Sequence, residues 1–400
     1  MAKLTAPLMK GKPALMGERP LFGKLVPLVR PVLPAFDDLA GEVRGILDSG
    51  MVTKGLHLRA FEESTAAHLG VKHAVAVSSC TTGLMLTYRG LGLTGEVVVP
   101  SFTFMATVSA LVWAGLRPVF ADVAADTANL DADAAERAIT PSTSALVAVH
   151  NFGNPADLDA LQVVADRHHV SLVLDAAHGF GTRYQGQPVG AQAKAHVYSL
   201  SPTKLLIAGE GGVVATNDDA LAENIRIGRE YGNAGNYDSR FAGINARMPE
   251  FNALLARYSL RGLEDAARRR NEVAELYREE LGQIPGLGFQ TVRAGNRSSY
   301  KDFSITIDGD AFGLNRDQVA RALSAENIDT RKYYDPPVHR HTAYRPWGPP
   351  AGRLPKTDEL AARSLSLPIW SHMDDSTARG ICQAFARIHD FAAEVAAVLT

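Results

Sequence analysis

The stretch that decides the fold is SLSPTK at residues 199–204, which is soon followed by GEGG at residues 209–212. A short loop with a proline presents Lys204 here, after a mostly apolar segment. Upstream, the apolar run 170–174 ends at Asp175, in the sequence DAAH. An aspartate at the end of a buried strand and a lysine on a later loop are the two groups that pyridoxal phosphate (PLP) requires.

Each of these two residues has a defined chemical task in that interpretation. The carboxylate of Asp175 would hold the pyridine nitrogen protonated, and the amine of Lys204 would form the Schiff base. Because this chemistry needs a neutral amine, we expect burial or a nearby positive charge to lower the pKa of Lys204. Either residue alone has a simpler explanation, as a solvated loop lysine or a helix-capping aspartate. Their occurrence together, in this order, favours the cofactor site.

Beyond these residues, the chain resembles the DegT/StrS-type sugar aminotransferases, which have the fold of aspartate aminotransferase. The resemblance rests on the sequences above and on VSSCT at 77–81, VPSFTF at 99–104 and GINARM at 243–248. It runs from about Phe36 to the C-terminal helix and so covers most of the chain. It implies an α/β protein of PLP-dependent fold type I. Such a protein has a large domain with a mainly parallel seven-stranded sheet, plus a smaller α+β C-terminal domain.

Strands and helices alternate along the first half of the chain, which predicts a sheet with helices on both faces. We expect an N-terminal segment at 1–35, a large PLP-binding domain at 36–265 and a small domain at 266–400. A bridging helix at about 249–281 would join the two domains. The expected strands are 74–77, 96–100, 119–123, 145–150, 171–174 and 303–307, and they are nearly all apolar, as buried strands should be. The other expected helices are 36–47, 58–69, 82–91, 105–113, 157–168, 316–326 and 375–399.

The resemblance also implies which residues contact the cofactor. Its phosphate would lie at a turn between a strand and a helix, on Cys80, Thr81 and the hydroxyl of Ser199. The family usually has glycine where this chain has Cys80, so we expect an ordinary φ there, since a positive φ would strain a cysteine. Phe104 would stack on the pyridine ring, and His178 would contact the phenolic oxygen. Helix capping, core packing and an exposed loop serine are the simpler alternatives.

The C-terminal run DTRKYYDPPVH, at residues 329–339, resembles the family's substrate-facing loop. Its cations and aromatic rings are suited to a nucleotide diphosphate, although a proline-stiffened surface loop is the alternative. The predicted substrate-binding residues are Arg331, Lys332, Tyr333, Tyr334 and His339. The resemblance sends Asn245 across a two-fold interface to the partner's cofactor phosphate, which implies a homodimer with shared active sites. An asparagine near a glycine is also a common turn residue.

We therefore expect a PLP-dependent aminotransferase that moves an amino group from L-glutamate to a nucleotide-linked keto-deoxysugar. The substrate-facing loop looks closest to members that act at carbon 4 of a dTDP-4-keto-6-deoxyhexose, in 4-amino-4,6-dideoxysugar synthesis. The alternatives are an inosose aminotransferase of aminoglycoside synthesis, a sugar 3-aminotransferase, and a non-catalytic regulatory protein that kept the fold. Sugar 3-dehydrases of the same fold carry a histidine in place of the lysine, so Lys204 argues against that activity.

Composition limits the partners. The formal net charge of −2 argues against a nucleic-acid binder, which would show a basic excess. The two cysteines, Cys80 and Cys382, have no disulfide or metal-ligand spacing, which is compatible with a reducing cytoplasm. No signal peptide is evident, and no charge-free apolar run reaches the roughly 18 residues of a membrane span. We expect a cytoplasmic protein without a metal, membrane or nucleic-acid partner.

Overall fold

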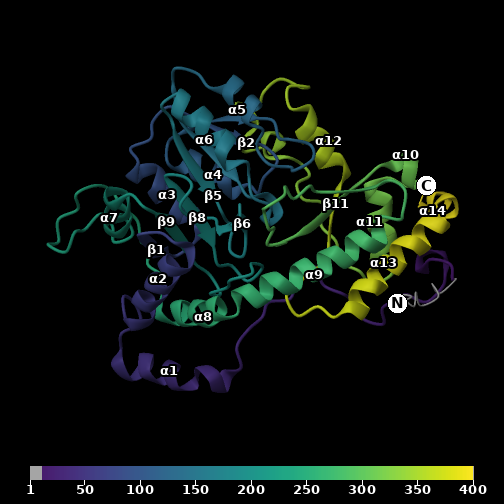
Figure 1. The fold of residues 1–400 in the computed structure, drawn as a ribbon, viewed down its shortest axis with the longest axis horizontal. Helices are drawn as coiled ribbons and strands as arrows, with labels where there is room; N and C mark the ends of the chain where they lie inside the picture. Colours follow the sequence, from purple (N-terminus) through teal and green to yellow (C-terminus); the bar gives the residue numbers. More distant parts are fainter. Residues whose placement is uncertain (1–10, 400) are drawn as a thin grey trace.

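A seven-stranded sheet forms the centre of the molecule, as the computed structural model of residues 11–399 shows (Figure 1). Its strands are β1 (His73–Val77), β2 (Glu96–Pro100), β3 (Arg117–Ala121), β4 (Thr143–Val149), β5 (Ser171–Asp175), β8 (Ala195–Ser199) and β9 (Gly212–Thr216). Their order across the sheet is β1-β9-β8-β5-β4-β2-β3. Only β9 runs antiparallel to its neighbours. The predicted α/β class and mainly parallel sheet are therefore confirmed.

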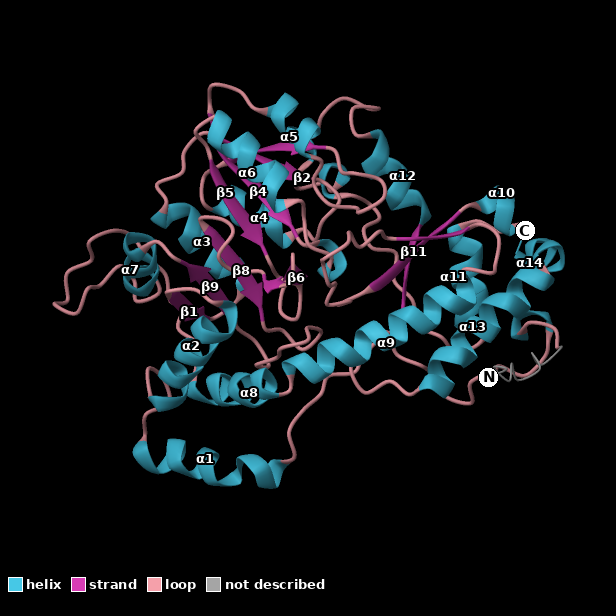
Figure 2. Ribbon diagram, in the orientation of Figure 1, coloured by secondary structure: helices cyan, strands magenta, loops and turns pink. Residues whose placement is uncertain are grey.

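Both faces of this sheet are apolar and covered by helices (Figure 2). In β1, Ala74 and Ala76 join one apolar cluster while Val75 and Val77 join another, because successive side chains point to opposite faces. The helices around the sheet are α2 (Leu56–Leu69), α3 (Cys80–Gly90), α4 (Ala106–Trp113), α5 (Ala132–Ala138), α6 (Leu158–Arg167), α7 (Asp219–Gly228) and α8 (Glu250–Arg261). Another helix, α1 (Phe36–Ser49), lies outside this layer.

A smaller antiparallel sheet packs against the C-terminal helices. It consists of β10 (Leu287–Phe289), β11 (Phe303–Ile307) and β12 (Ser364–Leu367), in that order. Its helices are α9 (Leu263–Leu281), α10 (Gly309–Phe312), α11 (Arg316–Ala325), α12 (Pro355–Arg363), α13 (Asp375–Asp390) and α14 (Ala392–Leu399). Residues of α9, α11 and α13 share an apolar cluster with this sheet. On this basis we propose that the large and small domains meet near residue 265, as predicted. The first ten residues of the predicted N-terminal segment lie outside the described range.

Two predicted helices are each divided in the structure. The bridging helix is broken at Gly262, whose backbone (φ −94°, ψ 5°) leaves the helical region between α8 and α9. Glycine has a low helix propensity, so a break costs least there. The final helix is likewise interrupted at Phe391, between α13 and α14. Among residues 11–399, no helix is long and apolar enough to cross a membrane.

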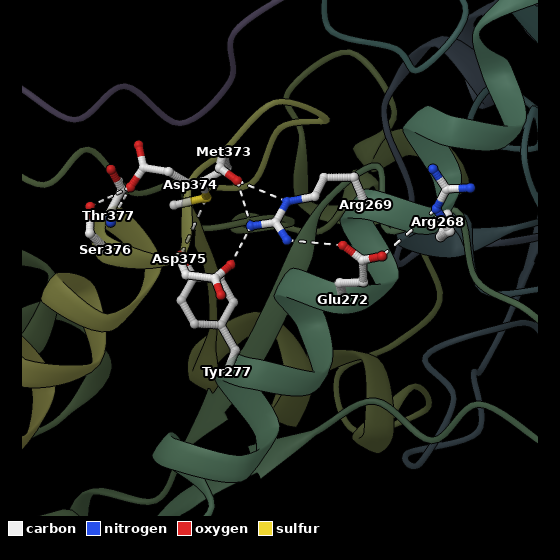
Figure 3. Close-up of polar contacts among 9 residues, drawn as sticks. All are labelled: Arg268, Arg269, Glu272, Tyr277, Met373, Asp374, Asp375, Ser376 and Thr377. Atoms are coloured by element: carbon white, nitrogen blue, oxygen red, sulfur yellow. Dashed lines mark hydrogen bonds and ion pairs between the residues drawn. The ribbon is translucent and has the colours of Figure 1, made fainter. Parts of the chain in front are cut away.

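Polar contacts fasten α9 to the start of α13 (Figure 3). The Arg269 guanidinium donates from Nε and Nη2 to the carbonyl of Met373, at 2.9 and 2.7 Å, and pairs with Asp375 at 2.5 Å. Asp374 caps α13 by accepting a hydrogen bond from the backbone N–H of Thr377 at 2.7 Å. These contacts hold α9, which reaches from the large sheet to the small one, against the C-terminal helix pair.

The remaining short elements lie in connections. They are β6 (Arg183–Tyr184), β7 (Gln187–Pro188) and the 3₁₀ turns η1 (Ala14–Met16), η2 (Asn151–Gly153), η3 (Val338–Arg340) and η4 (Arg345–Trp347).

Candidate active site

A cavity of about 340 Å³ lies at the edge of the large sheet where β1, β2, β4, β5 and β8 end. We call it the inner cavity. Parallel strands collect ligands at this edge. Nine of the predicted site residues line it: Cys80, Thr81, Phe104, Asp175, His178, Ser199, Lys204, Tyr333 and Tyr334.

Asp175 is a buried carboxylate that accepts two close hydrogen bonds and has a thiol nearby. The Thr107 hydroxyl donates to its Oδ2 at 2.7 Å, and the Ala177 backbone N–H donates to its Oδ1 at 3.0 Å. The thiol of Cys80 approaches the same Oδ1 at 3.8 Å. Burial raises the pKa of Asp175, while the bonds from Thr107 and Ala177 and the charge of Lys204 oppose that rise. The carboxylate is thus fixed in orientation, as a partner for a pyridinium nitrogen must be.

Lys204 reaches the inner cavity from the loop after β8, with its side chain partly exposed. Burial and, to a smaller extent, the positive charge of Lys301 lower its pKa from 10.5 to about 8. Both causes are those expected from the sequence. A large fraction of the amine is therefore neutral near pH 8, which is the form that attacks an aldehyde.

The turn before α3 forms a cradle of backbone N–H groups. Ser79 caps the helix by accepting from the N–H of Thr82 at 3.1 Å. Cys80 is the first helical residue and has no positive φ, as predicted. Its buried thiol donates to the carbonyl of Val197 at 3.4 Å, so the side chain points away from the turn. At Gly212, a Cβ would come within 2.6 Å of the Cys80 nitrogen, which explains a glycine at that position of the GEGG sequence.

His178 and Phe104 complete the wall of the inner cavity. His178 is buried, and its Nδ1 has no hydrogen-bond partner among the described residues. Burial and the charges of Lys204 and Lys301 lower the pKa of His178 well below 6.5, so the ring is neutral. Phe104 leaves half of its side chain exposed, at 51%. PLP fits this site. The unpartnered nitrogen of His178, the exposed ring of Phe104, the fixed carboxylate of Asp175, the neutral amine of Lys204 and the N-terminus of α3 each match one part of the cofactor.

A second cavity, of about 490 Å³, adjoins the first and shares part of its wall. We call it the outer cavity. The shared residues are Thr103, Phe104, Tyr333 and Tyr334. Arg331 and Lys332 line the outer cavity alone, where Lys332 pairs with Asp317 at 2.8 Å. The predicted substrate-binding loop therefore divides its residues between the two cavities.

His339 and Asn245 are not part of either cavity. The His339 side chain is buried, with its Nδ1 2.7 Å from the Ser101 hydroxyl and its ring 6.2 Å from that of Phe120. It lies in the 3₁₀ turn η3, and its contact with the substrate stays a prediction. Asn245 is exposed in this chain, and its contact with a partner subunit stays a prediction.

The predicted site residues did not include Thr107, Lys301 or Asp302, which also line the inner cavity. Thr107 lies three residues after Phe104, and that helical spacing was the signal for a shared face. Lys301 and Asp302 immediately precede β11, and no local sequence pattern marks them as site residues. Within the described range, no group of three or more potential metal ligands is arranged to hold a metal ion.

Comparison with known proteins agrees with this geometry. The model of the DegT/DnrJ/EryC1/StrS aminotransferase family matches residues 36–386. The chain is 37% identical to the dTDP-3-amino-3,4,6-trideoxy-alpha-D-glucose transaminase of Streptomyces venezuelae, over 88% of this chain and 93% of that protein. It is 39% identical to the erythromycin biosynthesis sensory transduction protein EryC1 of Saccharopolyspora erythraea, over 85% and 92%.

Solved structures extend the similarity to the whole fold. DesI, crystallised in the presence of its TDP-sugar product, superimposes with a TM-score of 0.91 at 37% identity, covering 96% of this chain and 98% of that one. DesV of S. venezuelae, solved with a ketimine intermediate, superimposes with a TM-score of 0.85 at 35% identity, covering 92% of this chain and 99% of that one. The chain belongs to the DegT/DnrJ/EryC1/StrS aminotransferase family and is a PLP-dependent sugar aminotransferase.

Proposed function

We propose that this enzyme transfers the amino group of L-glutamate to the 4-keto group of a dTDP-linked 6-deoxyhexose. The observation that carries this proposal is the pair of adjoining cavities. The inner one holds Lys204 and Asp175, and the outer one is lined by Arg331, Lys332 and aromatic rings. A sugar in the inner cavity would leave its diphosphate beside these cations. The similarity to DesI, solved with its TDP-sugar product, supports a nucleotide-linked substrate.

The chain's own residues would perform the proton transfers. PLP supplies an electron sink for the carbanion at the donor's α-carbon. Asp175 keeps the proton on the ring nitrogen, which makes that sink effective. The neutral amine of Lys204 would act as the base that moves the proton at the donor's α-carbon. The open ring of Phe104 and the neutral imidazole of His178 would orient the cofactor.

Amination at carbon 3 is the second candidate, because a relative with 37% identity is named as a dTDP-3-amino sugar transaminase. Arg331 and Lys332 are paired with Asp329 and Asp317 within the chain, and a diphosphate would give each cation a second anionic partner. Inosose carries no phosphate, so the two cations favour a nucleotide sugar. A sensory role, as in the name of EryC1, does not require a lysine and a carboxylate in one cavity. The catalytic function therefore agrees better with the site.

The test loads the protein with pyridoxamine phosphate and offers it one ketone at a time. The panel is a dTDP-4-keto-6-deoxyhexose, its 3-keto counterpart and scyllo-inosose. Return of the visible cofactor absorbance, with the amine product identified by mass spectrometry, measures the second half-reaction. We expect the fastest return with the 4-keto sugar. A faster return with the 3-keto sugar would establish the second candidate, and a return with inosose alone would refute a nucleotide-sugar substrate.

We also propose that two copies of the chain form a homodimer with shared active sites. Among the described residues of α1, only Ile46 is buried, whereas Phe36 and Leu47 are 73% and 62% exposed. This helix projects from the body of the molecule (Figure 1). Exposed apolar side chains on a projecting helix are suited to a protein interface. Asn245 is exposed too, and could reach a partner's cofactor phosphate across that interface.

A further inference from the structure

Lys301 and Asp302 form an ion pair in the wall of the inner cavity, and the cofactor site described above does not use it. The Lys301 Nζ lies 2.8 Å from Asp302 Oδ1, and the two residues are only 5% and 3% exposed. Burying both charges costs desolvation energy that their attraction barely repays, so such a pair contributes little to stability. Its position at a catalytic cavity instead indicates a functional use.

The backbone around this pair is held from two sides. The buried Arg270 of α9 donates from Nη1 to the carbonyls of Tyr300 at 2.9 Å and Lys301 at 3.0 Å. The Asp302 N–H donates to the carbonyl of Phe152, which belongs to the large domain, at 3.4 Å. The ammonium group of Lys301 therefore extends from a fixed backbone. Binding a ligand would cost little conformational entropy, because this segment is already ordered.

The pair has unused hydrogen-bonding capacity. An ammonium group carries three N–H donors, and Asp302 accepts from one of them. The ring of Tyr333 lies 5.5 Å from the ammonium nitrogen, on the side shared with the outer cavity. Asp302 Oδ2 has no hydrogen-bond partner among residues 11–399. Lys301 can therefore accept an anionic ligand while it keeps its bond to Asp302.

Lys301 is also the one cation that the described wall of the inner cavity offers to such a ligand. Among the described residues that line the inner cavity, the lysine and arginine side chains are Lys204 and Lys301, and Lys204 is committed to the cofactor. The charge of Lys301 lowers the pKa of both Lys204 and His178, which places it near the reacting groups. The phosphate cradle is built instead by the turn at Ser79. Arg331, lining the outer cavity, is left for the diphosphate.

We propose that Lys301 is the anchor for a carboxylate of the amino donor and that Asp302 is its built-in counter-ion. This inference rests on the proposed function, in which one cavity receives first an anionic amino acid and then an uncharged sugar ring. A cation without a counter-ion would bind the donor but would stay buried and unpaired while the sugar is bound. With Asp302 in place, the cation is neutralised in the second half-reaction, so both substrates can use the same space.

The test removes both charges together, with the double variant Lys301→Met/Asp302→Asn, so that no buried charge is orphaned. The matched control is Lys72→Met/Asp219→Asn, which removes an exposed lysine–aspartate pair (3.5 Å) outside both cavities. Calorimetry with glutarate on the PLP-loaded protein measures dicarboxylate binding. Loss of the visible absorbance at increasing L-glutamate measures the first half-reaction. A charge-assisted hydrogen bond implies a rise of about 10- to 100-fold in glutarate Kd and in the glutamate half-saturation concentration, with no rise in the control.

Several results would overturn the anchor. The first is unchanged glutarate affinity in the double variant, and the second is a wild type that does not bind glutarate. The third is a double variant in which both half-reactions lose the same factor in rate. A failure of the proposed function shows separately, as absent amination of every keto sugar by the pyridoxamine form, where no dicarboxylate takes part. If the double variant does not fold, a protection experiment on the wild-type protein still tests the anchor. Glutarate, but not neutral glutaramide, should protect Lys301 from an amine-modifying reagent in peptide mapping, and equal modification with both would refute the anchor.

Discussion

Replacing Thr107 with valine removes one hydroxyl and nearly preserves the shape of the side chain. That hydroxyl donates to Asp175 Oδ2 at 2.7 Å and lies 2.9 Å from the Thr103 hydroxyl. A hydrogen bond to a charged group contributes about 1.5–3 kcal/mol. Because this bond opposes the rise in the pKa of Asp175 caused by burial, its loss lets that pKa rise further. A larger fraction of Asp175 would then be protonated, and a neutral carboxyl group does not keep the ring nitrogen protonated.

The expected consequence is a fall in kcat of about 10- to 100-fold, since each 1.4 kcal/mol of barrier is about tenfold in rate. The ionised carboxylate is the active form of Asp175. A higher pKa therefore moves the acid limb of the kcat–pH profile toward higher pH, and the loss is largest on the acid side. The assay is the kcat–pH profile with the preferred nucleotide sugar, together with a pH titration of the bound cofactor's visible absorbance.

Two further variants make this prediction specific to the hydroxyl. Thr107→Ser keeps the donor, so its profile should stay within a few-fold of the wild type. Thr103→Val removes the neighbouring hydroxyl but not the bond to Asp175, so its effect should be smaller than that of Thr107→Val. If Thr107→Val gives the wild-type profile, or if Thr103→Val reproduces its loss, the hydroxyl does not control Asp175.

Three further predictions concern the amine and the dimer. Lys204→Ala should retain the fold, because a partly exposed loop side chain contributes little to the core, but should lose multiple turnover; wild-type-like steady-state transamination would refute its role. In the wild type, the rate at which added PLP attaches covalently should rise about tenfold per pH unit below pH 8 and level off above it, because only the neutral amine reacts and its pKa is about 8; a pH-independent rate, followed by absorbance, would contradict this. Co-refolding Lys204→Ala with Asn245→Ala should restore partial activity, because a mixed dimer has one site without either defect; mixed dimers as inactive as their parents would rule out shared sites.

The fold could be predicted in large part because its strands are short apolar runs whose order along the chain is regular. The strands at residues 96–100 and 303–307 agree with the structure at both ends. The runs predicted at 119–123 and 145–150 begin two residues earlier in the structure, since apolar patterning alone does not define where pairing begins. The prediction of one continuous bridging helix was wrong. The helical periodicity of the sequence continues across Gly262, but the backbone leaves the helical conformation there.

The site residues that could be predicted from the sequence are those at the ends of strands. Asp175 and Ser199 both end strands, so their place in the fold follows from the sheet itself. His339 was assigned from the composition of its loop, but the direction of its side chain depends on the turn that contains it, which composition does not determine. Lys301 reaches the inner cavity because the segment before β11 packs against the turn η2, and no local pattern encodes that contact.

This division between sheet and loops bears on substrate choice. The groups that we propose for the cofactor chemistry lie at the end of β5, in the loop after β8 and at the start of α4, as with Asp175, Lys204 and Thr107. The groups available to bind a substrate, such as Arg331 and Lys301, come from segments of the small domain. Changes in those segments can alter the sugar or the donor without disturbing the cofactor. The sequence therefore predicts the chemistry more firmly than the substrate, because only the chemistry is tied to the sheet.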